Sequence, residues 1–165
     1  IMTDWRVGQG FDIHRFQDGE PGDCRQMLCG VPVPVEQPLV AHSDGDVVLH
    51  AVTDAVLGAA GQGDLGDHFP DTDPQWSGAS GDRLLQHALN LAEAMGYRVA
   101  NIDLTIVAQV PRLSPWKPAM RERLAELTAL RPEDVNIKAT TMERLGPIGR
   151  REGIATHAVV LLRSL

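Results

Sequence analysis

The chain has 165 residues, which favours one domain over residues 1–165 with a substantial core and leaves little room for a second domain. The formal net charge is −7 and there is no basic run, which argues against a nucleic-acid surface and an anionic membrane face. No apolar run is long enough to span a bilayer, and the N-terminus lacks signal-peptide and transit-peptide patterns. We therefore expect a cytoplasmic protein that starts naturally at Met2, with Ile1 a remnant of expression.

The first predicted element is a strand at residues 6–16, RVGQGFDIHRF, which carries an acid and an imidazole. A strand has a side-chain period of two, so Asp12 and His14 share one face and Ile13 points to the other. A carboxylate beside an imidazole supplies two of the three ligands of a metal site. The alternative for such a pair is an ion pair at the edge of a sheet.

Residues 24–35 contain both cysteines and two closely spaced prolines. Cys24 and Cys29 have no second pair, so they do not indicate a cysteine zinc site, and we interpret both as free thiols. Pro32 and Pro34 favour an edge strand or a hairpin arm.

A helix is predicted at residues 44–60, closed by Gly61 and Gly63. It is apolar on most of its surface, yet Asp46, His50 and Asp54 lie four residues apart and so form one stripe. His50 could complete a three-ligand zinc site with the strand pair, leaving a fourth position open. We interpret Asp46 and Asp54 as partners that orient the zinc-bound imidazole. The alternative is a row of side chains bonded to neighbouring loops.

The Asp/Gly/Pro-rich residues 64–82 predict a long loop, and loops of this length in compact domains are usually functional or disordered. Ser80 is the predicted cap of a second helix that ends at Gly96. The buried face of that helix is predicted to contain Leu84, Leu85, Ala88, Leu91, Ala92 and Met95.

The C-terminal half alternates strands with one more helix. Residues 102–109 alternate apolar and polar side chains as a strand does, and Pro118 begins a third helix. Its apolar side contains Met120, Leu124, Leu127 and Leu130. Two further strands are predicted near residues 135–140 and 154–163. The order predicts an α+β fold, a two-layer sandwich in which helices pack on one face of a mixed sheet.

Several segments, in this order, resemble those of the 2-C-methyl-D-erythritol 2,4-cyclodiphosphate synthases: RVGQGFDIH, AHSDGDVVLHAVTDAVLGAA, GDLGDHFPDTDP, DLTIVAQVPRLSP, NIKATTMERLG and GRREGIA. The match covers nearly the whole chain. The resemblance implies a homotrimer of compact subunits with active sites between neighbours. It also implies a phosphorus-oxygen lyase of the non-mevalonate isoprenoid pathway. The reaction would convert 4-diphosphocytidyl-2-C-methyl-D-erythritol 2-phosphate to the cyclic diphosphate and CMP.

The resemblance implies Asp12, His14 and His50 as zinc ligands and Glu143 as the ligand of a magnesium or manganese ion. It also implies His42 and Thr141 as the residues that stabilise the transition state. Residues 64–66 would meet the cytidine ribose, residues 69–73 the methylerythritol part and residues 108–114 the cytosine. The implied substrate-binding residues are Asp12, His14, His42, Ser43, Asp64, Leu65, Gly66, Phe69, Pro70, Asp71, Thr72, Asp73, Ala108, Gln109, Val110, Pro111, Arg112, Leu113, Ser114, Thr140, Thr141, Met142, Glu143, Pro147 and Arg150.

Some of these residues also have ordinary structural interpretations. Thr140 and Thr141 could be turn residues after a strand, and Arg112 a solvated arginine. His68, His87 and His157 match no motif, and we interpret them as structural or surface residues.

Two positions depart from the family pattern. Pro147 stands where a phenylalanine is usual, and Arg151 where a small residue is frequent. In the family this region lines a cavity on the trimer axis that can hold an isoprenoid diphosphate, to which Arg150 could bind. We leave binding of that anion open.

Two other function classes compete with the cyclase. One is a trimeric small-molecule-binding protein without catalysis, which has no need of two metal positions. The other is a metal-dependent phosphohydrolase, in which zinc would activate water. The products separate the enzymes, because hydrolysis takes up solvent oxygen and gives a linear phosphate, whereas cyclisation does neither.

Overall fold

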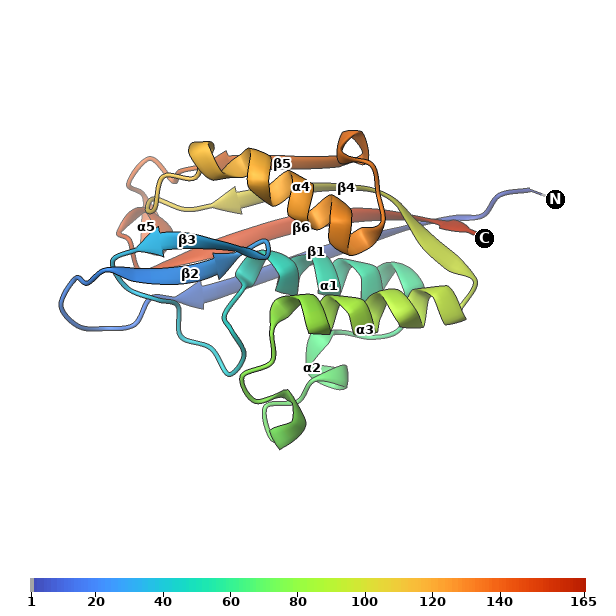
Figure 1. The fold of residues 1–165 in the computed structure, drawn as a ribbon, viewed down its shortest axis with the longest axis horizontal. Coiled ribbons are helices and arrows are strands. Elements are labelled where there is room, and N and C mark those ends of the chain that lie inside the picture. Colours follow the sequence, from blue (N-terminus) through green and yellow to red (C-terminus); the bar gives the residue numbers. More distant parts are fainter. Residues whose placement is uncertain (1) are drawn as a thin grey trace.

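The molecule is built on a mixed sheet with the strand order β1-β6-β4-β5 and a separate hairpin, β2-β3 (Figure 1). β6 runs antiparallel to both of its neighbours, whereas β4 and β5 are parallel. The computed structural model describes residues 2–165. Its strands are β1 (Trp5–Arg15), β2 (Cys24–Leu28), β3 (Val31–Val35), β4 (Tyr97–Val107), β5 (Val135–Thr140) and β6 (Gly153–Ser164).

The three longest helices pack on one face of the sheet, as predicted (Figure 1), whereas Ile148 of the short α5 packs against Val107 and Ala155 on the other face. α1 lies against β1 and β6, α3 packs on α1, and α4 packs on β5. The helices are α1 (Val47–Ala60), α2 (Leu65–His68), α3 (Gly81–Ala94), α4 (Lys117–Thr128) and α5 (Gly146–Gly149), with short 3-10 helices η1 (Pro74–Trp76), η2 (Ser114–Trp116) and η3 (Pro132–Asp134). Among residues 2–165, none of the helices has the length and apolar character needed to cross a membrane.

Two glycines of β1 let α1 approach the strand backbone. A Cβ at Gly8 would lie 1.9 Å from the carbonyl oxygen of Ala55, and one at Gly10 would lie 1.8 Å from that of Ala51. Any side chain at these positions would push the helix outward. The close contact fixes the first turns of α1 directly over the end of β1 that carries the predicted metal ligands.

The N-termini of the two long helices differ from the prediction. α1 begins at Val47 rather than at residue 44, because Asp46 is its N-cap and bonds to the N–H of Leu49. Ser80 occupies the N-cap position of α3 but makes no side-chain cap bond. Instead, Asp44 accepts from the N–H of Gly81 at 2.9 Å, so the carboxylate that precedes α1 caps α3.

Other sequence predictions have mixed outcomes. The strands and helices predicted in the C-terminal half are all present, and the prolines lie in a hairpin arm, β3. Cys24 and Cys29 are free thiols, as expected. The predicted long loop contains α2 and η1. Met95 is 48% exposed rather than buried, because it follows the last helical turn of α3.

The sheet face that turns away from the helices is apolar along β1 and β6. Val7, Phe11 and Ile13 alternate along β1 with residues that face the helices, and each is about half exposed or more. Val159 of β6 is 44% exposed, and the Phe11 ring lies 4.8 Å from that of His157. This largely apolar face, which also carries Gln9 and His157, is typical of an interaction surface.

Candidate metal centre and substrate cavities

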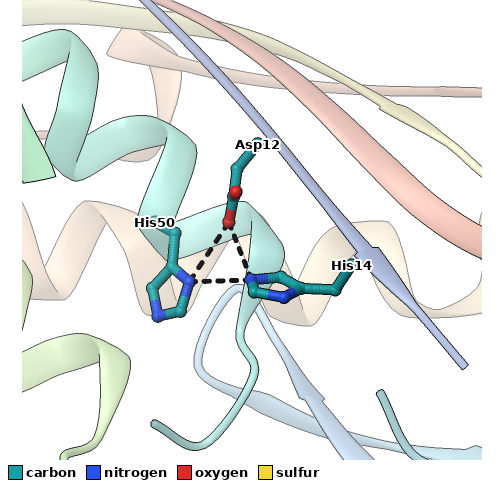
Figure 2. Close-up of side chains that lie close together, drawn as sticks. All are labelled: Asp12, His14 and His50. Carbon is teal, nitrogen blue, oxygen red and sulfur yellow. Dashed lines mark hydrogen bonds and ion pairs between the residues drawn. The ribbon is translucent and has the colours of Figure 1, made fainter. Parts of the chain in front are cut away.

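Asp12, His14 and His50 bring three ligand atoms together between β1 and α1 (Figure 2). Asp12 Oδ2 lies 2.9 Å from His14 Nε2 and 3.2 Å from His50 Nδ1, and these two nitrogens are 3.1 Å apart. Within residues 2–165, this is the one group of at least three such side chains close enough to share a metal ion. The grouping predicted from the strand and helix periods is confirmed.

This triangle is close to one face of a zinc tetrahedron. With ligand distances of about 2.0–2.2 Å, the donor atoms of a tetrahedral zinc site are about 3.3–3.5 Å apart. The separations in the structure are 2.9, 3.1 and 3.2 Å, so a small outward movement of the rings accommodates the ion. Two imidazoles and one carboxylate suit zinc, and three protein ligands leave a fourth position open.

Further hydrogen bonds determine which nitrogen of each imidazole faces the cluster. His14 Nδ1 lies 3.1 Å from the backbone oxygen of Val40. Because that oxygen can only accept, Nδ1 carries the proton, and neutral His14 presents the lone pair of Nε2. His50 Nε2 lies 3.0 Å from Ser43 Oγ, which leaves Nδ1 directed at Asp12. Outer partners of this kind orient metal-binding histidines.

The charges of the cluster favour an ionised carboxylate. Burial acts to raise the pKa of Asp12, but the hydrogen bonds and charges of His14 and His50 outweigh burial and lower that pKa to about 2. Burial acts to lower the pKa of His14, but the hydrogen bond and charge of Asp12 prevail and raise it above its usual value. An anionic Asp12 at neutral pH suits a cation at this position.

Asp46 and Asp54 do not orient His50, which corrects the interpretation drawn from their spacing. Asp46 is buried and accepts from three backbone N–H groups, two in the β2–β3 turn and one in the first turn of α1, at 2.8–3.0 Å. As the N-cap, its side chain turns back to the helix start. Asp54 accepts from the N–H of Leu65 at 2.9 Å, which ties α1 to the start of α2. Both carboxylates therefore hold neighbouring segments, the alternative left open above.

The metal position opens into a cavity of about 120 Å³. The cavity brings the three ligands together with residues predicted at the substrate phosphates and the methylerythritol part. It is lined by Asp12, His14, Ala41, His42, Ser43, His50, Leu65, Phe69, Asp71, Trp76 and Leu84.

Trp76 and Leu84 were not predicted as cavity residues. The Phe69 ring meets Trp76 edge-on at 4.6 Å, and both rings line the cavity, with His87 of α3 behind Phe69 at 5.2 Å. Arg83 lies over the outer Trp76 ring face at 4.8 Å. No motif marks Trp76, and the one available signal was a second aromatic residue, besides Phe69, in a loop rich in Asp, Gly and Pro.

Of the residues predicted in the segment 64–73, three line this cavity and the others do not. Asp64 caps α2 and Asp73 caps η1 through side-chain bonds to backbone N–H groups. Leu65, Phe69 and Asp71 line the cavity, whereas Asp64, Gly66, Pro70, Thr72 and Asp73 do not.

A second cavity, of about 170 Å³, lies where β4 and β5 end. It joins the segment predicted for cytosine to Thr140 and Thr141, and it shares no lining residue with the first cavity. Its residues are Ala108, Gln109, Pro111, Arg112, Leu113, Ser114, Ala139, Thr140 and Thr141. Val110 lines a separate groove beside the hairpin, with Pro111 and Arg151.

Glu143, the predicted second metal ligand, lies in an exposed turn after β5. Its N–H donates to Thr141 Oγ1 at 3.2 Å, and the next N–H, of Arg144, donates to Gln109 Oε1 at 3.2 Å. The turn that follows Met142 is thereby tied to the second cavity. In the described part of the chain Glu143 joins no group of three potential metal ligands.

The region that departs from the family pattern lies beside α5. Arg150 Nε donates to Glu152 Oε2 at 2.8 Å, so an anion there would compete with this carboxylate. Pro147 and Arg151 line a cavity of about 480 Å³ that also contacts Phe16.

The fold and the site together define a two-layer α+β protein with a three-ligand metal centre beside a mixed polar and apolar cavity. The chain belongs to the YgbB family of cyclodiphosphate synthases, whose family model matches residues 5–163.

Individual relatives agree with this assignment. A Pseudomonas putida protein named 2-C-methyl-D-erythritol 2,4-cyclodiphosphate synthase is 54% identical over 95% of this chain and 98% of its own length. A solved 2C-methyl-D-erythritol-2,4-cyclodiphosphate synthase structure, a CDP-bound form, has a TM-score of 0.85 at 38% identity, covering 95% of this chain and 99% of that one. The bifunctional IspDF of Campylobacter jejuni has a TM-score of 0.91 at 41% identity, and the match covers 99% of this chain but 43% of that longer one.

Proposed function

We propose that this protein is a cytoplasmic, CMP-releasing phosphorus-oxygen lyase. It converts 4-diphosphocytidyl-2-C-methyl-D-erythritol 2-phosphate to 2-C-methyl-D-erythritol 2,4-cyclodiphosphate and CMP. The observation that carries the proposal is the ligand triangle of Asp12, His14 and His50, which faces a cavity containing His42, Ser43 and Phe69. The relatives that share this fold carry the name of that synthase.

The reaction is an intramolecular phosphoryl transfer. An oxygen of the 2-phosphate attacks the β phosphorus, the bond from that phosphorus to the oxygen of the α phosphate breaks, and CMP leaves with that oxygen. Because the attacking group is tethered to the substrate, the protein contributes mainly by folding the substrate back on itself and by compensating charge. No side-chain nucleophile is needed.

The first cavity suits the part of the substrate that closes into a ring. His42 and Ser43 lie at its polar side and would donate to phosphate oxygens, and Phe69 and Trp76 at its apolar side suit the carbon skeleton. Bound to the ligand triangle, zinc would supply Lewis-acid polarisation of a phosphate oxygen. Asp12, His14 and His50 would hold the ion, and Val40 and Ser43 would keep both imidazoles in the required orientation.

The second cavity suits the cytidine diphosphate part. Backbone groups of residues 108–114 would read the edge of the cytosine, and the hydroxyls of Thr140 and Thr141 would donate to the diphosphate. Glu143, in the exposed turn beside them, would hold a magnesium or manganese ion. Thr141 also orders this turn by accepting from the Glu143 N–H, and it would stabilise charge as CMP leaves.

A homotrimer would join the two cavities. Within one chain they share no lining residue, and a trimer would set the first cavity of one subunit beside the second cavity of its neighbour. The apolar sheet face containing Val7, Phe11, Ile13 and Val159 offers the surface for this contact. Both observations support active sites between subunits.

Phosphorus NMR of the purified, zinc-loaded protein with the cytidyl-diphosphate substrate and magnesium tests the proposed reaction. We expect the substrate signals to be replaced by those of CMP and a cyclic diphosphate. A linear phosphate product would indicate a phosphohydrolase. Absence of turnover by a zinc-loaded, folded oligomer would indicate a binding protein.

A further inference from the structure

Thr156, in the middle of β6, has a buried hydroxyl without a partner. The residue is 0% exposed, and its Oγ1 is the one buried side-chain nitrogen or oxygen among residues 2–165 that makes no hydrogen bond. Other buried hydroxyls are paired; that of Thr53, for example, donates to the Leu49 carbonyl oxygen at 2.7 Å. An unpaired buried hydroxyl costs folding free energy, so its presence here calls for a partner that is recruited in another state of the site.

The strand register places Thr156 directly beside a metal ligand. β1 and β6 are antiparallel, and Thr156 is the residue opposite Asp12. Side chains of opposite residues project to the same face with their Cβ atoms about 4.5–5.5 Å apart. On its other side Thr156 is opposite Ile106 of β4, and its neighbours on the same face of β6 are Ile154 and Ala158. Asp12 is therefore the polar side chain among these neighbours.

One oxygen of the Asp12 carboxylate, Oδ1, is available to accept a hydrogen bond. Both imidazole contacts use Oδ2, at 2.9 Å to His14 and 3.2 Å to His50. In the described residues no hydrogen bond to Oδ1 is present. Asp46 and Asp54, the groups that the sequence suggested as outer partners, are bonded to backbone N–H groups elsewhere. The two histidines each have an outer partner and the carboxylate has none.

We propose that Thr156 is the positioning residue for the metal-binding carboxylate. Its hydroxyl donates, directly or through one water, to the oxygen of Asp12 that does not face the imidazoles, and it fixes the carboxylate plane when the ion is bound. Metal-ligating carboxylates are generally hydrogen-bonded in this way, and loss of such a bond weakens metal affinity. The inference rests on the metal centre of the proposed function and gives its third ligand the support that Val40 and Ser43 give the other two.

The proposal makes opposite predictions for the metal-free and metal-bound protein. In Thr156→Val a methyl group replaces the hydroxyl at nearly constant shape. The metal-free protein then loses an unpaired polar group, so its melting temperature should stay the same or rise. Its zinc dissociation constant should increase about 10-fold to 100-fold. A purely structural hydroxyl would instead lower the melting temperature and leave zinc affinity unchanged.

The test is zinc affinity, measured by competition with a chromogenic chelator, together with the melting temperature of the metal-free protein. Thr156→Ser retains the hydroxyl and should restore wild-type affinity. Thr128→Val is the matched control, because it removes a buried hydroxyl that donates to Leu124 at 2.7 Å on α4, and should leave zinc affinity unchanged.

Wild-type zinc affinity in Thr156→Val would overturn the inference while leaving the metal centre in place. A zinc affinity of Thr156→Ser that stays as weak as that of Thr156→Val would also overturn the inference. The same holds if the metal-free Thr156→Val protein melts well below wild type. Wild-type protein that binds no zinc would instead refute the metal centre and the inference with it.

Discussion

At the scale of single residues, the metal centre depends on how each ligand is held. Hydrogen bonds to Val40 and Ser43 hold the rings of His14 and His50 in place. The rings therefore need no further ordering when an ion binds. Asp12 is kept ionised by its two histidine neighbours. The combination explains how one strand and one helix turn can present a preorganised site.

Replacing His50 with alanine removes one of three ligands and should abolish stoichiometric zinc binding, as measured by elemental analysis of the dialysed protein. Asp54→Asn is the control, because Asp54 lies on the same helix but bonds to the N–H of Leu65. We expect it to retain one zinc per chain. Full zinc content in His50→Ala would remove His50 from the ligand set, and zinc loss in Asp54→Asn would restore the role that its spacing suggested.

The sequence predicted the three side chains that meet in this cluster but not the groups that orient them. Asp12, His14 and His50 follow from the strand and helix periods, which depend on local geometry. Val40 contributes a backbone oxygen, and every residue type has one, so the sequence does not indicate this role. Thr156 lies beside Asp12 only through the pairing of β1 with β6, which joins the two ends of the chain. Such non-local contacts are invisible to periodicity.

At the scale of elements, Asp46 connects α1 to the β2–β3 hairpin. Its carboxylate is the N-cap of α1 and also accepts from the N–H groups of Cys29 and Gly30 at 2.9 and 2.8 Å. The sequence predicted this residue inside the helix, because a periodic pattern does not separate a polar N-cap from a polar first turn. Periodicity gave the extent of the helix but not this tertiary contact.

Asp46→Ala should therefore destabilise the fold rather than the metal centre. It removes a helix cap and leaves two buried N–H groups unpaired, for a loss of about 2–4 kcal/mol in the free energy of unfolding. Thermal denaturation should show a lower melting temperature, with one zinc per chain retained below the transition. A variant of wild-type stability that has lost its zinc would contradict this assignment and favour an orienting role.

The loop that forms the apolar cavity wall should respond to pH through His87. Burial and the nearby charge of His68 lower the pKa of His87 below its usual 6.5. Because the pKa of His87 is lower in the folded state than in the unfolded state, the neutral side chain stabilises the folded loop at pH values above 6.5. This stabilisation is lost as the pH falls from 6.5 towards the lower folded-state pKa. Fluorescence of the neighbouring Trp76 should change as the pH falls below 6.5.

In that experiment His87→Gln is the control, because glutamine does not titrate and the change in fluorescence should be largely lost. An identical pH profile in wild type and His87→Gln would show that His87 does not control the loop. The remaining tryptophans, Trp5 and Trp116, lie outside the Phe69–Trp76–His87 cluster and provide a constant background.

At the scale of the whole molecule, the two faces of the sheet differ in their side chains and in what covers them. The helix-covered face contains the core and directs Asp12 and His14 towards α1, and the other face is largely apolar and exposed along β1 and β6 in the single chain. The mixed sheet and its one-sided helix layer were predictable from the order of elements. Separation of the predicted substrate residues into two cavities was not predictable from that order, because it depends on where β4 and β5 end relative to α1.

Val159→Glu tests the role of the open face. The new carboxylate would lie opposite Asp103 of β4, in the middle of the surface proposed for assembly. Burial of this charge should prevent trimer formation, so light scattering should give the mass of a monomer, and turnover should be lost while zinc is retained. Val159→Thr should remain trimeric and active. A trimer of wild-type affinity in Val159→Glu would place the interface elsewhere.

The central claim is that the ligand triangle serves an intramolecular transfer rather than hydrolysis. The most direct measurement is turnover in water enriched in heavy oxygen, with mass spectrometry of both products. We expect a cyclic diphosphate and CMP that contain no solvent oxygen, because the attacking oxygen comes from the substrate's own 2-phosphate. Heavy oxygen in a linear phosphate product would contradict the claim and identify an enzyme that activates water.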